Sequence, residues 1–208
     1  MTPDEMSRAT RAICELAPIV PVLVIDDAAG AKPLAEALVK GGLPALEVTL
    51  RTPAAYEAIR EMAQVPGGRV GAGTLLTPED VEAALDAGAT FGVSPGATDR
   101  LLDAAEANGL PLLPGAATAS EVMRLLERGY AVQKFFPAEA SGGAPALKAI
   151  GAPIPQVAFC PTGGVTPGNA PGYLALPNVL CVGGSWVAPK GASDAEVEAL
   201  AREAAALL

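Results

Sequence analysis

The stretch VGAGTLLTPEDVEAALDAGATFGVS, residues 70–94, carries one complete strand–helix–strand pattern. Short apolar runs at 70–75 and 91–94 predict two buried strands. Between them, Thr77 and Pro78 give a helix cap followed by proline at the first helical position, and Gly88 stands where a left-handed C-cap is expected. Two strands joined by a helical crossover are predicted to run parallel.

The same pattern recurs along the chain. Apolar runs ending in glycine, proline or threonine predict strands over residues 19–25, 45–50, 70–75, 91–94, 111–113, 131–136, 156–160 and 179–182. Helical segments rich in alanine and leucine lie between them, with further candidate N-caps at Thr118, Ser120 and Ser193 and further candidate stops at Gly41-Gly42, Gly109 and Gly129. Two more helices are expected, over 1–16 ahead of the first strand and over 194–208 at the end.

Eight strand–helix units with no linker or composition break predict one α/β domain over residues 1–208. The predicted architecture is a closed (β/α)8 TIM barrel with an extra N-terminal helix. The alternative is an open, doubly wound sheet, which needs about five or six strands and usually a glycine-rich dinucleotide turn. No GxGxxG follows an early strand, and the number of units favours the barrel.

Composition excludes several classes of protein. A chain of 208 residues with 50% hydrophobic and 18% charged residues can bury a sizeable core, so it is not a disordered protein. It contains no histidine, which excludes Ser-His-Asp triads and HExxH zinc sites. The formal net charge is −9 and no block of lysine or arginine occurs, so neither nucleic acid nor an anionic membrane is an expected partner.

The three cysteines, Cys14, Cys160 and Cys181, stand at wide spacings without a CxxC pair. Reduced thiols in the cytoplasm are the simplest interpretation. The apolar run at 16–25 is broken by two prolines and is too short to span a membrane, and the N-terminus lacks the apolar centre of a secretory signal.

Polar residues on buried strands are the candidates for chemistry, because a barrel holds its active site at the carboxyl ends of its strands. In LEVTLR, residues 46–51, alternation places Glu47, Thr49 and Arg51 on one face. In AVQKFFP, residues 131–137, one lysine, Lys134, stands in an apolar run and shares a face with Phe136.

Apolar surroundings disfavour a charged lysine, so the amine of Lys134 is expected to be neutral and nucleophilic. The alternative is that Lys134 only forms an interior ion pair, with Glu47 as its candidate partner. The other four lysines fall on predicted helices or loops and are expected to be solvated.

Glycine pairs follow the last two predicted strands, at Gly163-Gly164 and at Gly183-Gly184 before Ser185. Many barrels bind phosphate there through backbone amides. The alternative is that each pair makes only a tight turn. Thr74 and Pro95, at the ends of the third and fourth strands, allow the same two interpretations, site residue or turn.

Six segments, in order along the chain, resemble those of the 2-keto-3-deoxy-6-phosphogluconate (KDPG) aldolase family of class I aldolases. They are LEVTLR (46–51), GAGT (71–74), SPG (94–96), KFFPAEA (134–140), FCPTGG (159–164) and GGSW (183–186). The resemblance implies that Lys134 forms a Schiff base and that Glu47 is the acid/base. It also implies a carboxylate site at Arg51 and Thr74, a wall at Pro95 and Phe136, and a phosphate site at Thr162, Gly163, Gly164, Gly184 and Ser185.

The implied reaction is reversible cleavage of 2-dehydro-3-deoxy-6-phosphogluconate, a phosphorylated 2-keto acid, to pyruvate and glyceraldehyde 3-phosphate, without a metal or cofactor. Cleavage of 4-hydroxy-2-oxoglutarate to pyruvate and glyoxylate is implied as a second activity, and a homotrimer as the assembly. The alternatives are an aldolase for the galactonate epimer, a phosphate-binding barrel isomerase or epimerase, and a barrel that binds phosphosugars without turnover.

Overall fold

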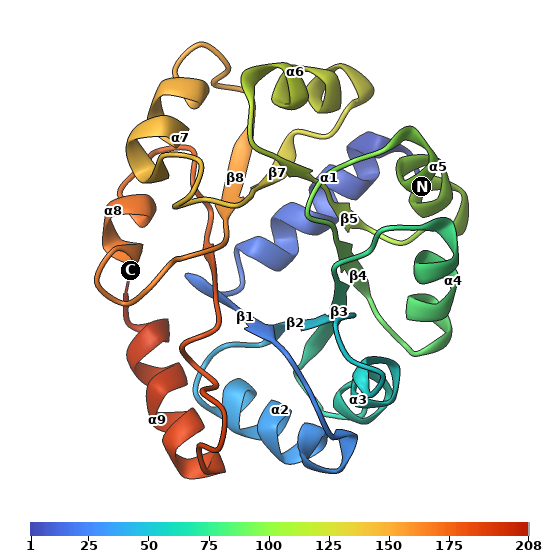
Figure 1. Ribbon diagram of the computed structural model, residues 1–208, viewed down its shortest axis with the longest axis vertical. Coiled ribbons are helices and arrows are strands. Elements are labelled where there is room, and N and C mark those ends of the chain that lie inside the picture. The colour runs from blue at the N-terminus through green and yellow to red at the C-terminus, as the bar shows by residue number, and fades with distance from the viewer. Residues whose placement is uncertain (208) are drawn as a thin grey trace.

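The computed structural model describes residues 1–207, in which strands and helices alternate (Figure 1). The strands are β1 (Ile19–Leu23), β2 (Ala45–Thr49), β3 (Arg69–Gly73), β4 (Phe91–Val93), β5 (Leu112–Leu113), β6 (Gly115–Ala116), β7 (Val132–Phe135), β8 (Ala158–Pro161) and β9 (Val182–Gly184). The α-helices are α1 (Pro3–Cys14), α2 (Ala31–Lys40), α3 (Ala55–Met62), α4 (Pro78–Asp86), α5 (Asp99–Asn108), α6 (Ala119–Arg128), α7 (Gly143–Gly151), α8 (Ala170–Leu174) and α9 (Asp194–Ala205), and a short 3-10 helix precedes α2.

All strand pairs within the described residues are parallel. One sheet has the order β5-β4-β3-β2-β1-β9, and a second has the order β6-β7-β8. An isolated parallel bridge between Thr162 and Gly183 joins the end of β8 to β9. The result is an α/β fold with parallel strands in a curled sheet, with helices around the strands (Figure 1).

The predicted fifth strand, 111–113, corresponds to β5, whereas β6, which follows Pro114, is a strand that the apolar runs did not predict. Proline has no N–H to donate to a ladder, so the pairing of the chain is interrupted at this residue. A Cβ on Gly115 would overlap the backbone of Pro95, so only glycine lets the β4–α5 loop approach this closely. The chain therefore bends and pairs with β4 before Pro114 and with β7 after it.

The predicted last strand, 179–182, is also misplaced, since β9 covers Val182–Gly184. Val179 makes only an isolated bridge to Phe159. The glycines instead pair with β1, in the registers Val20 with Gly183 and Pro21 with Gly184. Packing against a neighbouring strand has overridden the low strand propensity of glycine.

Most predicted helix ends are confirmed. Thr77, Thr118 and Ser193 each cap a helix through a reciprocal pair of hydrogen bonds, a capping box. Ser120 is not a cap, because it lies inside α6. Gly42, Gly88, Gly109 and Gly129 adopt positive φ just after helices, as the stop signals predict. The ends of α1 and α9 fall short of the predicted ranges 1–16 and 194–208, and residue 208 lies outside the described residues.

The buried side chains form two separate clusters. The larger one lies between the outward faces of the strands and the helices. The smaller, inner cluster contains Val20, Ala45, Phe91, Val93, Leu113, Val132 and the three cysteines. Cys14 belongs to α1, which crosses the middle of the ring of helices (Figure 1). Helix α1 thus covers the end of the strands opposite their carboxyl termini.

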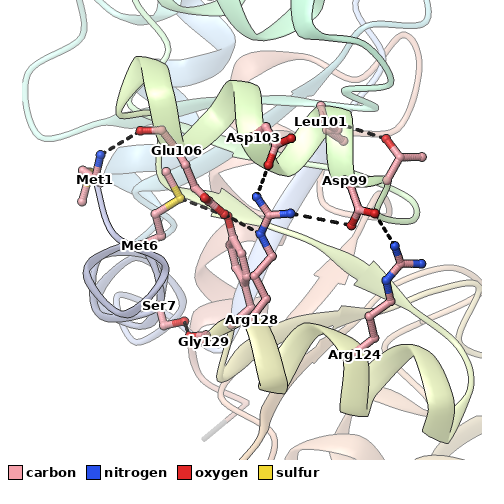
Figure 2. Close-up of polar contacts among 12 residues, drawn as sticks. Met1, Met6, Ser7, Asp99, Leu101, Asp103, Glu106, Arg124, Arg128 and Gly129 are labelled. Carbon is pink, nitrogen blue, oxygen red and sulfur yellow. Dashed lines mark hydrogen bonds and ion pairs between the residues drawn. The ribbon is translucent and has the colours of Figure 1, made fainter.

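Polar contacts fix α1 against α5 and α6 (Figure 2). Ser7 Oγ donates to the carbonyl of Gly129 at 3.0 Å and accepts from the amide of Ala131 at 2.9 Å. The buried hydroxyl of Tyr130 donates to Glu106 at 3.0 Å and contacts the sulfur of Met6. Burial raises the pKa of Tyr130, and the nearby carboxylate of Glu106 adds to this effect, so the hydroxyl stays protonated as a donor.

None of the helices within residues 1–207 has the length and apolar character needed to cross a membrane. The three cysteines are buried and unpaired in disulfides.

Candidate active site

Lys134 and Glu47 form a buried ion pair inside the curled sheet. Lys134 lies on β7, between Gly115 of β6 and Cys160 of β8, and Glu47 lies on β2. Lys134 Nζ donates to Glu47 Oε1 at 3.1 Å, and the two residues are 5% and 3% exposed. The interior ion pair that the sequence allowed as one interpretation is therefore present, in a place where charges are costly unless paired.

The neighbouring strand β3 makes room for the carboxylate. Gly73, the last residue of β3, packs directly against Glu47, and a Cβ at this position would overlap Oε1 and approach Cγ at 2.6 Å. Gly73 belongs to the GAGT segment, where the sequence alone indicated no role for it. In the structure, Glu47 occupies the space that a side chain at residue 73 would fill.

The ring of Phe136 covers the amine. Lys134 Nζ lies 5.3 Å from the centroid of this ring, within the range of a cation–π interaction. The two residues lie on the same face of the chain at an interval of two, as predicted from the alternation. Gln133, which precedes Lys134 on β7, points outward and donates to the carbonyls of Val122 and Tyr130.

An open cavity of about 340 Å³ lies at the carboxyl ends of these strands. Six of the predicted site residues line it, namely Arg51, Phe136, Thr162, Gly163, Gly164 and Ser185. Four residues without a predicted role also line it, namely Val22, Val24, Val165 and Gly183. Alternation along β1 could have identified Val22 and Val24, because they follow the inward-facing Val20 at intervals of two.

Five predicted site residues do not line this cavity: Glu47, Lys134, Thr74, Pro95 and Gly184. Lys134 lies behind its wall, since its ammonium contacts the ring of Phe136, which does line the cavity. A Cβ on Gly184 would overlap the ring of Trp186, whereas Gly183 faces Thr162. Thr74 follows β3 in the left-handed region, with φ 65°, a conformation that is uncommon for a β-branched residue. Such conformations cost roughly 1–3 kcal/mol and cluster at functional sites.

The backbone of the glycine loop is held in one orientation. Gly163 and Gly164 have positive φ, and a Cβ on Gly164 would meet Glu139 at 2.8 Å. The carbonyls of Thr162 and Gly163 accept from the amides of residues 138 and 139, and the carbonyl of Gly164 accepts from Asn169 at 3.1 Å. Consecutive residues of this kind form an anion-binding concavity when their amides converge.

The three thiols lie together in the inner cluster, where Cys160 of β8 is paired in register with Lys134 of β7. Hydrogen bonds with Cys14 and Cys181 lower the pKa of Cys160, and the charge of Lys134 adds to this. Hydrogen bonds with Cys14 and Cys160, together with burial, raise the pKa of Cys181. Within residues 1–207, no group of three histidine, cysteine, aspartate or glutamate side chains is arranged to hold a metal ion.

Comparison with known proteins identifies a class of enzyme for this fold and site. The family described as "KDPG and KHG aldolase" matches residues 10–202, where KHG is 4-hydroxy-2-oxoglutarate, and the chain belongs to this family. The 2-dehydro-3-deoxy-phosphogluconate aldolase of Zymomonas mobilis is 56% identical over 195 residues, which cover 93% of this chain and 94% of that protein.

Two solved structures are similar over nearly their whole length. The KDPG aldolase of Zymomonas mobilis ZM4 with 3-phosphoglycerate has a TM-score of 0.95 and 54% identity, covering 97% of both chains. The KDPG aldolase of Legionella pneumophila, with pyruvate captured at low pH as a covalent carbinolamine intermediate, has a TM-score of 0.91 and 46% identity, covering 94% of this chain and 97% of that one.

Proposed function

We propose that this protein is a class I aldolase that cleaves 2-dehydro-3-deoxy-6-phosphogluconate to pyruvate and glyceraldehyde 3-phosphate. The observation that carries the proposal is the buried pair of Lys134 and Glu47, 3.1 Å apart, beside a cavity lined by Arg51 and a glycine loop. Family membership supports the reaction, and the carbinolamine in the Legionella relative supports covalent attachment of pyruvate.

The first half of the reaction makes an electron sink. A neutral amine must attack, so Lys134 first passes a proton to Glu47 along their hydrogen bond. The amine then adds to the C2 carbonyl of the substrate to give a carbinolamine. Glu47 returns its proton to the departing hydroxyl, so that loss of water leaves a cationic imine and an ionised Glu47. The imine withdraws electrons from the bond between C3 and C4.

The second half uses the carboxylate as base and then as acid. Glu47 takes the proton of the C4 hydroxyl, the C3–C4 bond breaks, and glyceraldehyde 3-phosphate leaves. The same group protonates the remaining enamine at C3. Water then hydrolyses the imine, which releases pyruvate and regenerates the amine of Lys134.

The substrate's two anionic ends are assigned to two parts of the site. Arg51 can bind the carboxylate in a two-pronged geometry, with Thr74 beside it. The phosphate is assigned to the loop of Thr162, Gly163 and Gly164 with Ser185, and to Gly184 at the end of β9, while Pro95 and Phe136 form the wall around the imine. Cleavage of 4-hydroxy-2-oxoglutarate is proposed as a second activity, since this substrate differs only at the end that carries phosphate.

We further propose that the strands close into a (β/α)8 barrel, with β5 and β6 serving as one strand and α1 as an additional helix. The bridge from Thr162 to Gly183 supports closure between β8 and β9. One domain over residues 1–208, a homotrimeric assembly and a cytoplasmic location belong to the same proposal, and the unpaired cysteines support a reducing compartment.

Borohydride trapping tests the proposal directly. Incubation with pyruvate followed by reduction is expected to attach the three-carbon unit to Lys134, as mapped by peptide mass spectrometry. Omission of pyruvate is the control. Absence of an adduct at Lys134, or an adduct on a surface lysine instead, would refute the Schiff-base mechanism. A barrel that only binds phosphosugars would give no adduct.

The Gly73→Ala variant tests whether the position of Glu47 matters. The added methyl is expected to displace the carboxylate, lowering kcat by about 10- to 100-fold and the free energy of unfolding by about 1–3 kcal/mol. Steady-state kinetics and urea denaturation measure the two effects. Gly172→Ala is the matched control, since a Cβ there meets no atom within 4 Å. A folded Gly73→Ala variant with unchanged kcat would contradict the assigned role.

A further inference from the structure

Two charged residues without a role in the proposed mechanism lie beside the candidate site. Lys190, in the loop after β9, places its ammonium 2.8 Å from the carboxylate of Asp26, in the loop after β1. Because β1 and β9 pair with each other, these loops are neighbours. The side chains are 91% and 61% exposed, and ion pairs of this kind contribute little to stability.

The pair opens into a cavity that adjoins the proposed phosphate end. Lys190 and Asp26 line an open cavity of about 540 Å³, together with Ser185. Val22, Val24 and Ser185 line this cavity and also the cavity of about 340 Å³ described above. The ammonium of Lys190 and the predicted phosphate-binding residue Ser185 therefore face one continuous opening.

The opening offers few cations to balance the charge of a phosphate. Arg51 and Lys190 are the basic residues that line these two cavities in the described chain, and Arg51 is assigned to the carboxylate. A phosphate monoester carries about −1.5 to −2 charges at pH 7, and the protein itself has a net charge of −9. The hydrogen bond from Lys190 to Asp26 raises the pKa of this lysine, so its side chain is cationic at neutral pH.

We propose that Lys190 determines specificity for phosphorylated substrates, and that the substrate phosphate displaces Asp26 from its ammonium. This inference rests on the proposed function and deepens it. A phosphate offers more charge and more acceptor oxygens than one exposed carboxylate, so the exchange favours the phosphate. The flexible four-carbon stem of lysine can carry the ammonium from one partner to the other.

The exchange predicts opposite effects for the two partners. Lys190→Gln removes the cation and is expected to lower kcat/KM for 2-dehydro-3-deoxy-6-phosphogluconate about 3- to 10-fold, mainly through KM. Asp26→Asn removes the competitor and is expected to raise kcat/KM for the same substrate about 2-fold. In the double variant, Asp26→Asn is expected to add nothing, because its effect depends on Lys190.

A second substrate and a second lysine are the controls. The 4-hydroxy-2-oxoglutarate molecule lacks the phosphate, so Lys190→Gln is expected to change its kcat/KM by less than about 2-fold. Lys40→Gln makes the same charge change at an exposed lysine that pairs with Glu198 at 2.7 Å, and neither residue lines these cavities. This control is expected to leave both substrates unaffected.

Equal losses with both substrates, or no loss with the phosphorylated one, would overturn the proposal. Calorimetric titration with 3-phosphoglycerate measures binding affinity without any need for turnover. Lys190→Gln is expected to weaken this binding about 3- to 10-fold, and unchanged binding would also refute the role. If the wild-type protein bound 3-phosphoglycerate through Lys190 but cleaved neither 2-keto acid, the proposed function would fail and the assignment of Lys190 would stand.

Discussion

Replacement of Lys134 by alanine is expected to abolish cleavage, lowering kcat by about 10⁴-fold or more. The imine is the only electron sink in the proposed mechanism, and no other lysine takes part in the buried pair. The same change leaves Glu47 buried without its partner, so the free energy of unfolding is expected to fall by about 3–5 kcal/mol unless the carboxyl group becomes protonated. Aldolase assays and urea denaturation measure the two losses separately.

A double variant separates catalysis from stability. Lys134→Met combined with Glu47→Met replaces the buried pair by apolar side chains of similar length, and such replacements are often neutral or stabilising. We expect the double variant to regain most of the stability that Lys134→Ala loses, with no recovery of cleavage or borohydride trapping. Measurable cleavage in the double variant would show that the ion pair has only a structural role.

Glu47→Gln is expected to lower kcat by about 10²- to 10⁴-fold while the protein still forms a trappable adduct with pyruvate. The amide can accept a hydrogen bond from Lys134 but cannot take the proton of the C4 hydroxyl. Imine formation should slow without being lost, because water can carry the protons of that step. Single-turnover kinetics with mass spectrometry of the reduced adduct resolve the two stages.

Glu57→Gln is the matched control for this substitution, since Glu57 is an exposed glutamate paired with Arg60 at 2.9 Å. Its kcat is expected to equal that of the wild type. Equal cleavage rates for Glu47→Gln and the wild type would remove Glu47 from the mechanism. Loss of both cleavage and adduct would instead show that imine formation itself requires Glu47.

Much of the fold and of the candidate site followed from local sequence signals. Alternation on two strands placed Glu47 and Lys134 on inward faces, and parallel strands bring such positions to one place. Capping signals such as Thr77 with Pro78 fixed helix starts because the hydrogen bonds involved span only three residues. Both signals act over short distances and are therefore visible in one sequence.

The features that sequence analysis missed depend on contacts between distant segments. The break at Pro114 brings Gly115 against the backbone of Pro95, where a Cβ would not fit. The space for Glu47 comes from Gly73, on the next strand, and the pair of Lys190 and Asp26 joins residues 164 positions apart. No local periodicity encodes such pairings, because each depends on how the strands are ordered in the sheet.

The separation of the buried side chains into two clusters has a consequence for evolution. The helices are anchored by the outer cluster, whereas the proposed chemistry stands on the inner face, beside the smaller one. Selection can then act on the two sets with little interference, because a substitution on the inner face away from Cys14 of α1 leaves the contacts of the outer helices intact. Enzymes with this scaffold can therefore evolve a new substrate preference while the packing of their outer helices is preserved.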